Sequence, residues 1–305
     1  MMKLNLTTLA AILALSLATA HSTDSSENNK LRGLWLRDSM STQVDMEQRQ
    51  EEASENCFLS RNELDRAIRI YFNGGKDRVE ETYGEIRDWC VSNIEDFSNL
   101  FKGNKSFNEP LDGWDLSNAK STHSMFFGCT YFNQDISMWD TGKVTDMSYM
   151  FVNARSFNQN LSDWDTSSVE NMQAMFNGAY SFNGELLDWD VSNVRDMSFM
   201  FEYANKFNQE LFAWDVSNVE NMASMFFYAT SFNQDISLWE VDSVENISTM
   251  FWGSFSFNQN LCAWGEHLTA EYALTIAPFH YTSCPDMGEP DLASNPSSPF
   301  CHPCA

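Results

Sequence analysis

The chain has 305 residues, 43 % of them hydrophobic and 14 % aromatic, so it can bury a core and is not a wholly disordered acidic polymer. Its 43 acidic and 18 basic residues give a net charge of −25. This argues against nucleic acid or an anionic membrane surface as partner, because both need clustered Lys and Arg.

The N-terminus has the pattern of an export signal. After Lys3 the chain is largely apolar up to Ala18-Thr19-Ala20, a small-x-small cleavage pattern. We therefore expect residues 1–20 to be a signal peptide and the product to be secreted, either free or associated with a cell surface or wall. No later apolar run reaches the length of a membrane-spanning helix, so we expect no direct membrane insertion. Residues 21–55 are polar and predict a flexible leader.

A helical cap is predicted over residues 56–82. Ser60-Arg-Asn-Glu63 forms a capping box, and it opens an amphipathic pattern with Leu64, Ala67 and Ile68. Asn73-Gly74-Gly75 is expected to end that helix. Such a cap would cover the open end of the repeats that follow.

The middle of the chain repeats every 25 residues. A fixed period in this range is typical of a solenoid, in which one unit cannot bury its apolar face alone and neighbours must stack. The strictest columns are Trp at 89, 114, 139, 164, 189, 214, 239 and 264 and Phe at 101, 126, 151, 176, 201, 226 and 251, with Phe-Asn pairs beginning at 107, 132, 157, 182, 207, 232 and 257.

One unit, residues 157–181, predicts a short strand, a turn and a short helix. Leu161 and Trp164 alternate with polar residues, whereas Val169, Met172 and Met175 follow helical spacing. The expected fold is therefore an α/β repeat solenoid over residues 83–266, a right-handed stack like leucine-rich repeats with a parallel strand ladder. Residues 267–284 are expected to form a C-terminal cap, and residues 285–305 a Pro/Cys-rich tail.

The polar columns have structural explanations. Asn108 and its equivalents are expected to form a buried ladder that bonds turn backbone groups. Asp165 and its equivalents follow Trp and are expected to cap the next turn. Calcium is the alternative ligand for these stacked carboxylates; otherwise we expect no cofactor.

Seven cysteines in an exported chain suggest three disulfides and one leftover thiol. Cys129 is the expected leftover, because four other units have Ala in its column, at 154, 179, 204 and 229. We expect Cys57 to pair with Cys90 and two bonds among the last four cysteines, whose connectivity the sequence leaves open: Cys262, Cys284, Cys301 and Cys304.

No catalytic constellation stands out, and an enzyme is not expected. Nucleophile-elbow, zinc-protease, phosphate-loop and dinucleotide motifs are absent from the sequence. Three N-x-S sequons are candidate glycosylation sites, at Asn104, Asn160 and Asn246, of which Asn104 is favoured because the other two lie in repeat columns.

The repeat resembles a known family. The string W-D-x-S-x-V-x-[DN]-M-x-x-M-F stands here as Trp139-Asp140 with Val144, Met147, Met150 and Phe151, followed by Phe157-Asn158-Gln159. It is similar to the BspA-like leucine-rich-repeat surface proteins, the 25-residue type of mycoplasma surface lipoproteins and algal secreted proteins, over about residues 83–265. The resemblance implies an extracellular solenoid for adhesion or recognition, without catalytic residues.

Function is then expected to depend on the variable positions. Those just before Trp form a candidate strand-face surface for a protein or glycan partner: Met138, Asp163, Leu187, Asp188, Phe212 and Leu238. A second candidate surface is formed by aromatic residues that either stack on sugar rings or cover the core: Tyr203, Phe227, Tyr228 and Trp252. The alternative hypothesis is an acidic, calcium-responsive matrix protein, motivated by the net charge. The oligomeric state is not indicated by the sequence.

Overall fold

The computed structural model describes residues 57–268, 276–290 and 299–304. They belong to one compact unit, Asn56–Ala305. The predicted signal peptide and polar leader lie outside the described residues. No helix in the described part is long and apolar enough to cross a membrane.

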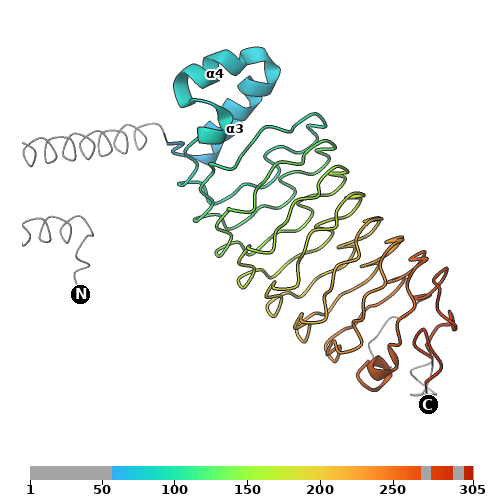
Figure 1. The fold of residues 1–305 in the computed structure, drawn as a ribbon. Coiled ribbons are helices and arrows are strands. Elements are labelled where there is room, and N and C mark those ends of the chain that lie inside the picture. Colours follow the sequence, from blue (N-terminus) through green and yellow to red (C-terminus); the bar gives the residue numbers. More distant parts are fainter. Residues whose placement is uncertain (1–56, 269–275, 291–298, 305) are drawn as a thin grey trace, which may run out of the picture. The chain divides into compact units, whose positions relative to one another are not determined.

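The N-terminal cap is a helical hairpin (Figure 1). Helix α3 spans Arg61–Ile70, a π-helical turn η1 spans Tyr71–Gly75, and α4 spans Lys76–Tyr83. As the capping box predicts, the Ser60 hydroxyl accepts the Glu63 N–H. The Glu63 carboxylate in turn accepts the N–H of Leu59 at 2.9 Å. The second helix, α4, was not predicted from the sequence. It begins after Gly74, whose φ of +88° reverses the direction of the chain.

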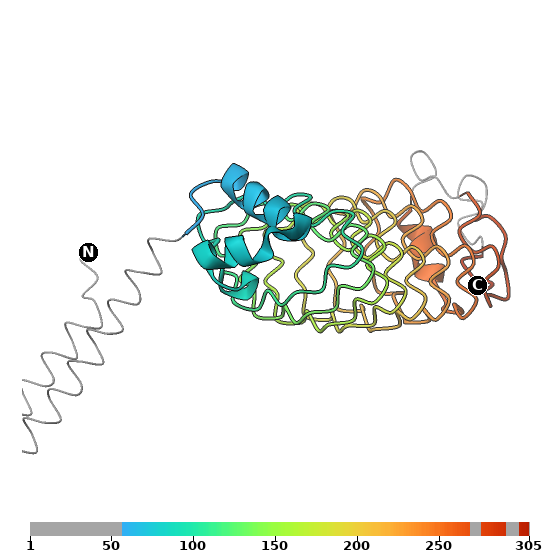
Figure 2. The same ribbon diagram turned by 90° about the horizontal axis from the view of Figure 1, so that it is seen from above.

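Ring contacts attach this cap to the first repeat. Tyr71 packs edge-on against Trp89 with centroids 5.7 Å apart, and Phe72 packs edge-on against Phe107 at 5.6 Å. A 3₁₀ turn, η2 (Ile86–Asp88), leads into the repeats. Figure 2 shows α3 and α4 at the end of the stack where the first coil begins.

The repeats are stacked 25-residue coils without strands or helices of their own. Neighbouring coils share isolated parallel bridges, one per coil, at Asp96, Ser121, Asp146, Asn171, Asp196, Asn221 and Asn246. No sheet forms among the described residues, and the α-helices lie in the cap. The predicted α/β solenoid with a strand ladder and one short helix per unit is therefore wrong.

The backbone conformation after each bridge explains that error. A short helix was expected in the second half of the unit 157–181. Two residues there, Ala174 and Gly178, have φ values of +54° and +66°, which an α-helix cannot contain. The N–H groups therefore alternate between two kinds of partner. Ala174 and Phe176 donate to Ser198 and Met200 in the next coil, at 2.8 and 2.9 Å, whereas Met175 donates within its own coil to Met172. The helical spacing of the buried side chains thus arises from successive tight turns.

The core consists of the predicted apolar columns. Trp164, Met175 and Phe176 are at most 3 % exposed. The Trp rings of neighbouring coils lie parallel, as for Trp164 and Trp189 with centroids 6.3 Å apart. Each inner Trp also donates its indole N–H to the preceding coil, Trp164 to the carbonyl of Ile136 at 3.0 Å. Each inner Trp is therefore held in the core by a specific hydrogen bond as well as by the burial of its apolar area.

The C-terminal end is closed by a partial coil and two disulfides. After the 3₁₀ turn η3 (Cys262–Glu266), residues 276–280 run beside the last full coil, where Thr249, Phe251 and Gly253 donate to their carbonyls. The structure pairs Cys57 with Cys90, Cys262 with Cys304 and Cys284 with Cys301. Cys129 is a buried free thiol, as expected. The described parts of residues 267–284 thus close the stack.

Candidate functional site

The Asp column that follows Trp caps turns, as predicted. Asp165 accepts the N–H of Ser167 at 3.0 Å and its hydroxyl at 2.6 Å, and these bonds lower the pKa of the carboxyl. No group of three or more His, Cys, Asp or Glu within the described ranges is placed to hold a metal ion. The carboxylates of this column thus already have protein partners.

The Asn ladder exists but lies at the surface, so the expectation of a buried ladder is wrong. The Asn133 side-chain oxygen accepts the backbone N–H of Asn158 at 2.8 Å, and the same bond recurs between Asn158 and Asn183. Asn133 and Asn158 are exposed. The ladder holds turn backbone in place on the outside of the coils.

The candidate residues before each Trp occupy a two-residue turn. The Trp164 N–H donates to the Leu161 carbonyl at 3.1 Å, which closes the turn around Ser162 and Asp163. We call the two turn residues that precede each core Trp the pre-tryptophan edge. Because the buried Leu161 and Trp164 flank the turn, its residues point outward. The candidate residues therefore lie on turns, and the predicted strand face is absent.

Large apolar side chains are exposed along this edge. Met138 is 82 % exposed, Leu238 79 % and Phe212 50 %. Asp163 and Asp188 are exposed and Leu187 is half-buried. Turn residues of neighbouring coils are 25 positions apart, so the edge presents a different pair of side chains at every coil.

Two adjacent coils depart from the pattern on this edge. In most coils a Gln side chain donates to the previous coil, as Gln159 does to the Asn133 carbonyl at 2.9 Å. Gly184 has no side chain to make that bond. Glu185 and Glu210 stand where four other coils have an Asp or Asn that caps the turn, as Asn160 caps Ser162 at 3.1 Å. The unusual residues can be seen in the sequence, but the surface hollow that they line could not be predicted from it.

A surface hollow of about 450 Å³ lies at these two coils. It is lined by Ser162, Glu185, Leu186, Leu187, Asp188, Asn208, Gln209, Glu210 and Gln234. The carboxylates of Glu185, Asp188 and Glu210 are exposed, and none forms an ion pair with another described residue. The hollow therefore combines a leucine side chain with three uncompensated negative charges.

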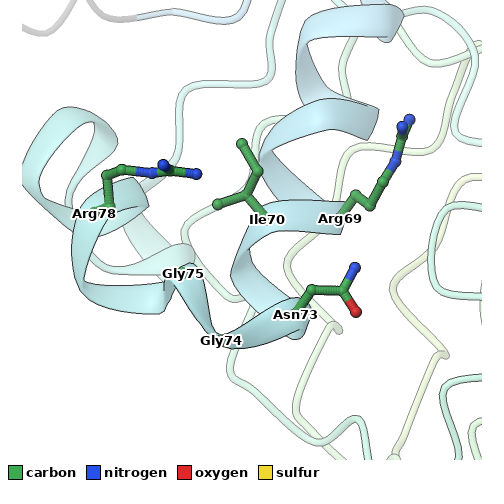
Figure 3. A pocket seen from close by; sticks show the side chains of 6 residues that line it. All are labelled: Arg69, Ile70, Asn73, Gly74, Gly75 and Arg78. Atoms are coloured by element: carbon green, nitrogen blue, oxygen red, sulfur yellow. The ribbon is translucent and has the colours of Figure 1, made fainter.

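A second, shallower hollow lies between the cap helices. It has a volume of about 510 Å³ and is lined by Arg69, Ile70, Asn73, Gly74, Gly75 and Arg78. In Figure 3 the Arg78 side chain points toward Ile70, whereas that of Arg69 points away from it. The two guanidinium groups do not converge on one point, so the hollow is not a built anion site. Sequence reasoning did not anticipate it.

The sequons differ in accessibility. Asn160 is exposed, whereas Asn104 and Asn246 are half-buried. The side-chain oxygen of Asn246 accepts the Ser248 N–H at 2.9 Å. Exposure therefore favours Asn160 over Asn104, contrary to the order expected from the repeat columns.

Together the coils and their edge define a 25-residue repeat protein with a variable outer turn. The model of the family described as "Mycoplasma protein of unknown function, DUF285" matches residues 71–189 and 181–275, together more than half of the chain. The chain belongs to this family. No curated protein and no solved structure matches it.

Proposed function

We propose that this protein is a secreted, non-enzymatic recognition or adhesion protein of the BspA-like type, and that it binds an extracellular partner through the pre-tryptophan edge. The observation that carries the proposal is the exposure of three large apolar side chains, Met138, Phe212 and Leu238, each on the equivalent turn of a different coil. Exposed apolar groups rimmed by polar residues mark interaction surfaces.

The three disulfides support the extracellular part of the proposal. Such bonds persist in oxidising compartments and are rare in the cytosol. The constant core beneath a variable edge supports the recognition part, because rigid scaffolds commonly carry function on their variable turns.

A protein partner suits this edge better than an anionic glycan. The hollow beside Leu187 carries the unpaired carboxylates of Glu185, Asp188 and Glu210. Complementary charge sets the choice of partner and speeds association. A partner protein that presents a basic group beside an apolar side chain would complement both the carboxylates and the Leu187 side chain of the hollow.

The test compares the secreted chain with a variant carrying Leu187→Ser and Phe212→Ser. Serine is the residue that three other coils have at this position, as Ser137, Ser162 and Ser237. Both proteins are screened against immobilised extracellular-matrix proteins and a glycan array. We expect wild-type binding that the variant loses by about tenfold or more, with an unchanged thermal midpoint. Arg195→Gln, away from the edge, is the control. Equal binding by the wild type, by this variant and by a second variant carrying Met138→Ser and Leu238→Ser would refute the role of the edge.

A further inference from the structure

A second surface is built from aromatic side chains of neighbouring coils. We call Tyr203, Phe227, Tyr228, Trp252 and Phe255 the aromatic surface. The Tyr203 and Tyr228 rings lie 5.4 Å apart at 20°, Phe227 and Trp252 6.5 Å apart at 20°, and Phe255 packs edge-on against Tyr228. Tyr203 is 38 % and Phe255 53 % exposed. The contacts form one continuous group across three coils.

Two of these tyrosines occupy a backbone position that disfavours them. Tyr203 and Tyr228 have φ values of +56° and +53°, in the left-handed region. Other coils place Gly103, Gly128, Asn153, Gly178 or Gly253 at this position. A non-glycine residue there costs about 1–2 kcal/mol. Glycine occupies this position in four other coils, so the two tyrosines are not needed to form the turn.

Two other rings of the aromatic surface, Phe227 and Phe255, lack the cations that cover their equivalents in earlier coils. In earlier coils the Lys102 ammonium lies 4.7 Å above the Phe127 ring, and the Arg155 guanidinium lies 5.1 Å above the Tyr180 ring. Each cation comes from the preceding coil. Phe227 shares the column of Phe127, but the residue one coil before it is Glu202.

Phe255 likewise has no cation from the preceding coil over its ring. It shares the column of Tyr180, and the residue one coil before it is Thr230. No Lys or Arg follows Lys206 in the sequence, whereas twelve Asp and Glu do. The basic side chain from this part of the chain that meets the surface is His280, which stacks on Trp252 with centroids 4.9 Å apart and leaves Phe227 and Phe255 uncovered. Exposed rings in this negative field attract cations from outside the molecule.

We propose that the aromatic surface binds Lys or Arg side chains of a basic protein segment, which take the places that Lys102 and Arg155 fill in the earlier coils. This inference rests on the proposed recognition function, but it concerns a different surface and names the partner's chemistry. Rings supply cation–π contacts, and the net charge of −25 attracts a basic segment toward the chain.

The test titrates the full secreted chain with a synthetic peptide of alternating Arg and Gly, followed by calorimetry. A second peptide has Gln at every Arg position. We expect binding of the Arg peptide that weakens steeply with salt, and no binding of the Gln peptide. Tyr203→Gly with Tyr228→Gly restores the usual column residue, so we expect the fold to survive and affinity to fall about tenfold. Tyr131→Ser, which removes an exposed Tyr outside the surface, is the matched control.

Three results would overturn the inference: equal binding of the two peptides, unchanged affinity in the double glycine variant, or loss of affinity in the Leu187→Ser, Phe212→Ser variant alone. The last result would leave the proposed function standing. Phe255→Thr, which copies Thr230, repeats the test if the double variant fails to fold. Binding of neutral cello-oligosaccharides in place of the Arg peptide would assign the surface to sugars.

Discussion

Arg61 of α3 donates from Nη2 to the backbone carbonyl of Ser98 at 2.7 Å, and from Nη1 to that of Asp96 at 2.7 Å. In later coils the equivalent carbonyls accept backbone N–H groups from the preceding coil, as Gln173 accepts from Tyr149. The first coil has no coil before it. The guanidinium therefore stands in for two missing backbone donors.

This relationship predicts that Arg61→Lys destabilises the chain. A lysine cannot match the fork of a guanidinium, so we expect a loss of about 1–2 kcal/mol in the free energy of unfolding, measured by urea denaturation with circular dichroism. Arg195→Lys, in an exposed ion pair with Glu220, is the control and should cost less than about 0.5 kcal/mol. Equal costs would contradict the capping role.

The indole hydrogen bond predicts a difference between two buried tryptophans. Trp164→Phe keeps most of the apolar area but removes the indole donor, so the Ile136 carbonyl keeps only the bond from the Trp139 N–H at 3.3 Å. We therefore expect a cost of about 1 kcal/mol beyond the lost contacts. Trp264 is equally buried, yet its indole N–H has no partner among the described residues. Trp264→Phe should therefore cost less in the same urea titration. Trp164→Ala should cost about 3–5 kcal/mol.

Cys129 is predicted to be unreactive while the chain is folded. Burial raises the pKa of its thiol to about 12, and the thiolate is the reactive form. We expect no reaction with a disulfide reagent at about pH 8 in native buffer, and one thiol per chain in denaturant. Cys129→Ala should show none in either condition. Reaction in native buffer at the denatured rate would disprove the buried assignment.

The turn-capping aspartates predict a stability that depends on pH. Bonds from Ser167 lower the pKa of Asp165 below its ordinary value of 3.8, and bonds from Ser217 do the same for Asp215. A carboxyl with a depressed folded pKa stabilises above its unfolded pKa, and that stabilisation is lost as the pH falls through the folded value.

Asp165→Asn with Asp215→Asn keeps the acceptor oxygens but removes the titration. We therefore expect the variant to lose less stability than the wild type when the pH falls below about 4, measured as urea midpoints. Parallel curves for the two proteins would show that these carboxyls do not contribute to acid unfolding.

The sequence defined the repeat register, the buried Trp and Phe columns and the start of the cap helix, because each depends on side-chain periodicity or local capping. The local conformation was predicted wrongly. Ala174 and Phe199 adopt left-handed φ although neither residue type favours it, so stacking between coils overrides local preference. The hollow at Glu185 and the strain at Tyr203 depend on that same backbone, and no single-residue signal predicts them.

The two ends of the stack consist of groups that occur once in the chain, the Arg61 fork and the carbonyls of residues 276–280, whereas everything between them repeats. The length of the stack can therefore change while the coils and the two ends keep the same structure. Loss of one unit, such as residues 157–181, would bring the helical hairpin one step nearer to Tyr203 without disturbing either terminus. Evolution can therefore change the distance between the helical hairpin and the aromatic surface by copying or deleting DNA in multiples of one unit, leaving the hairpin and that surface intact.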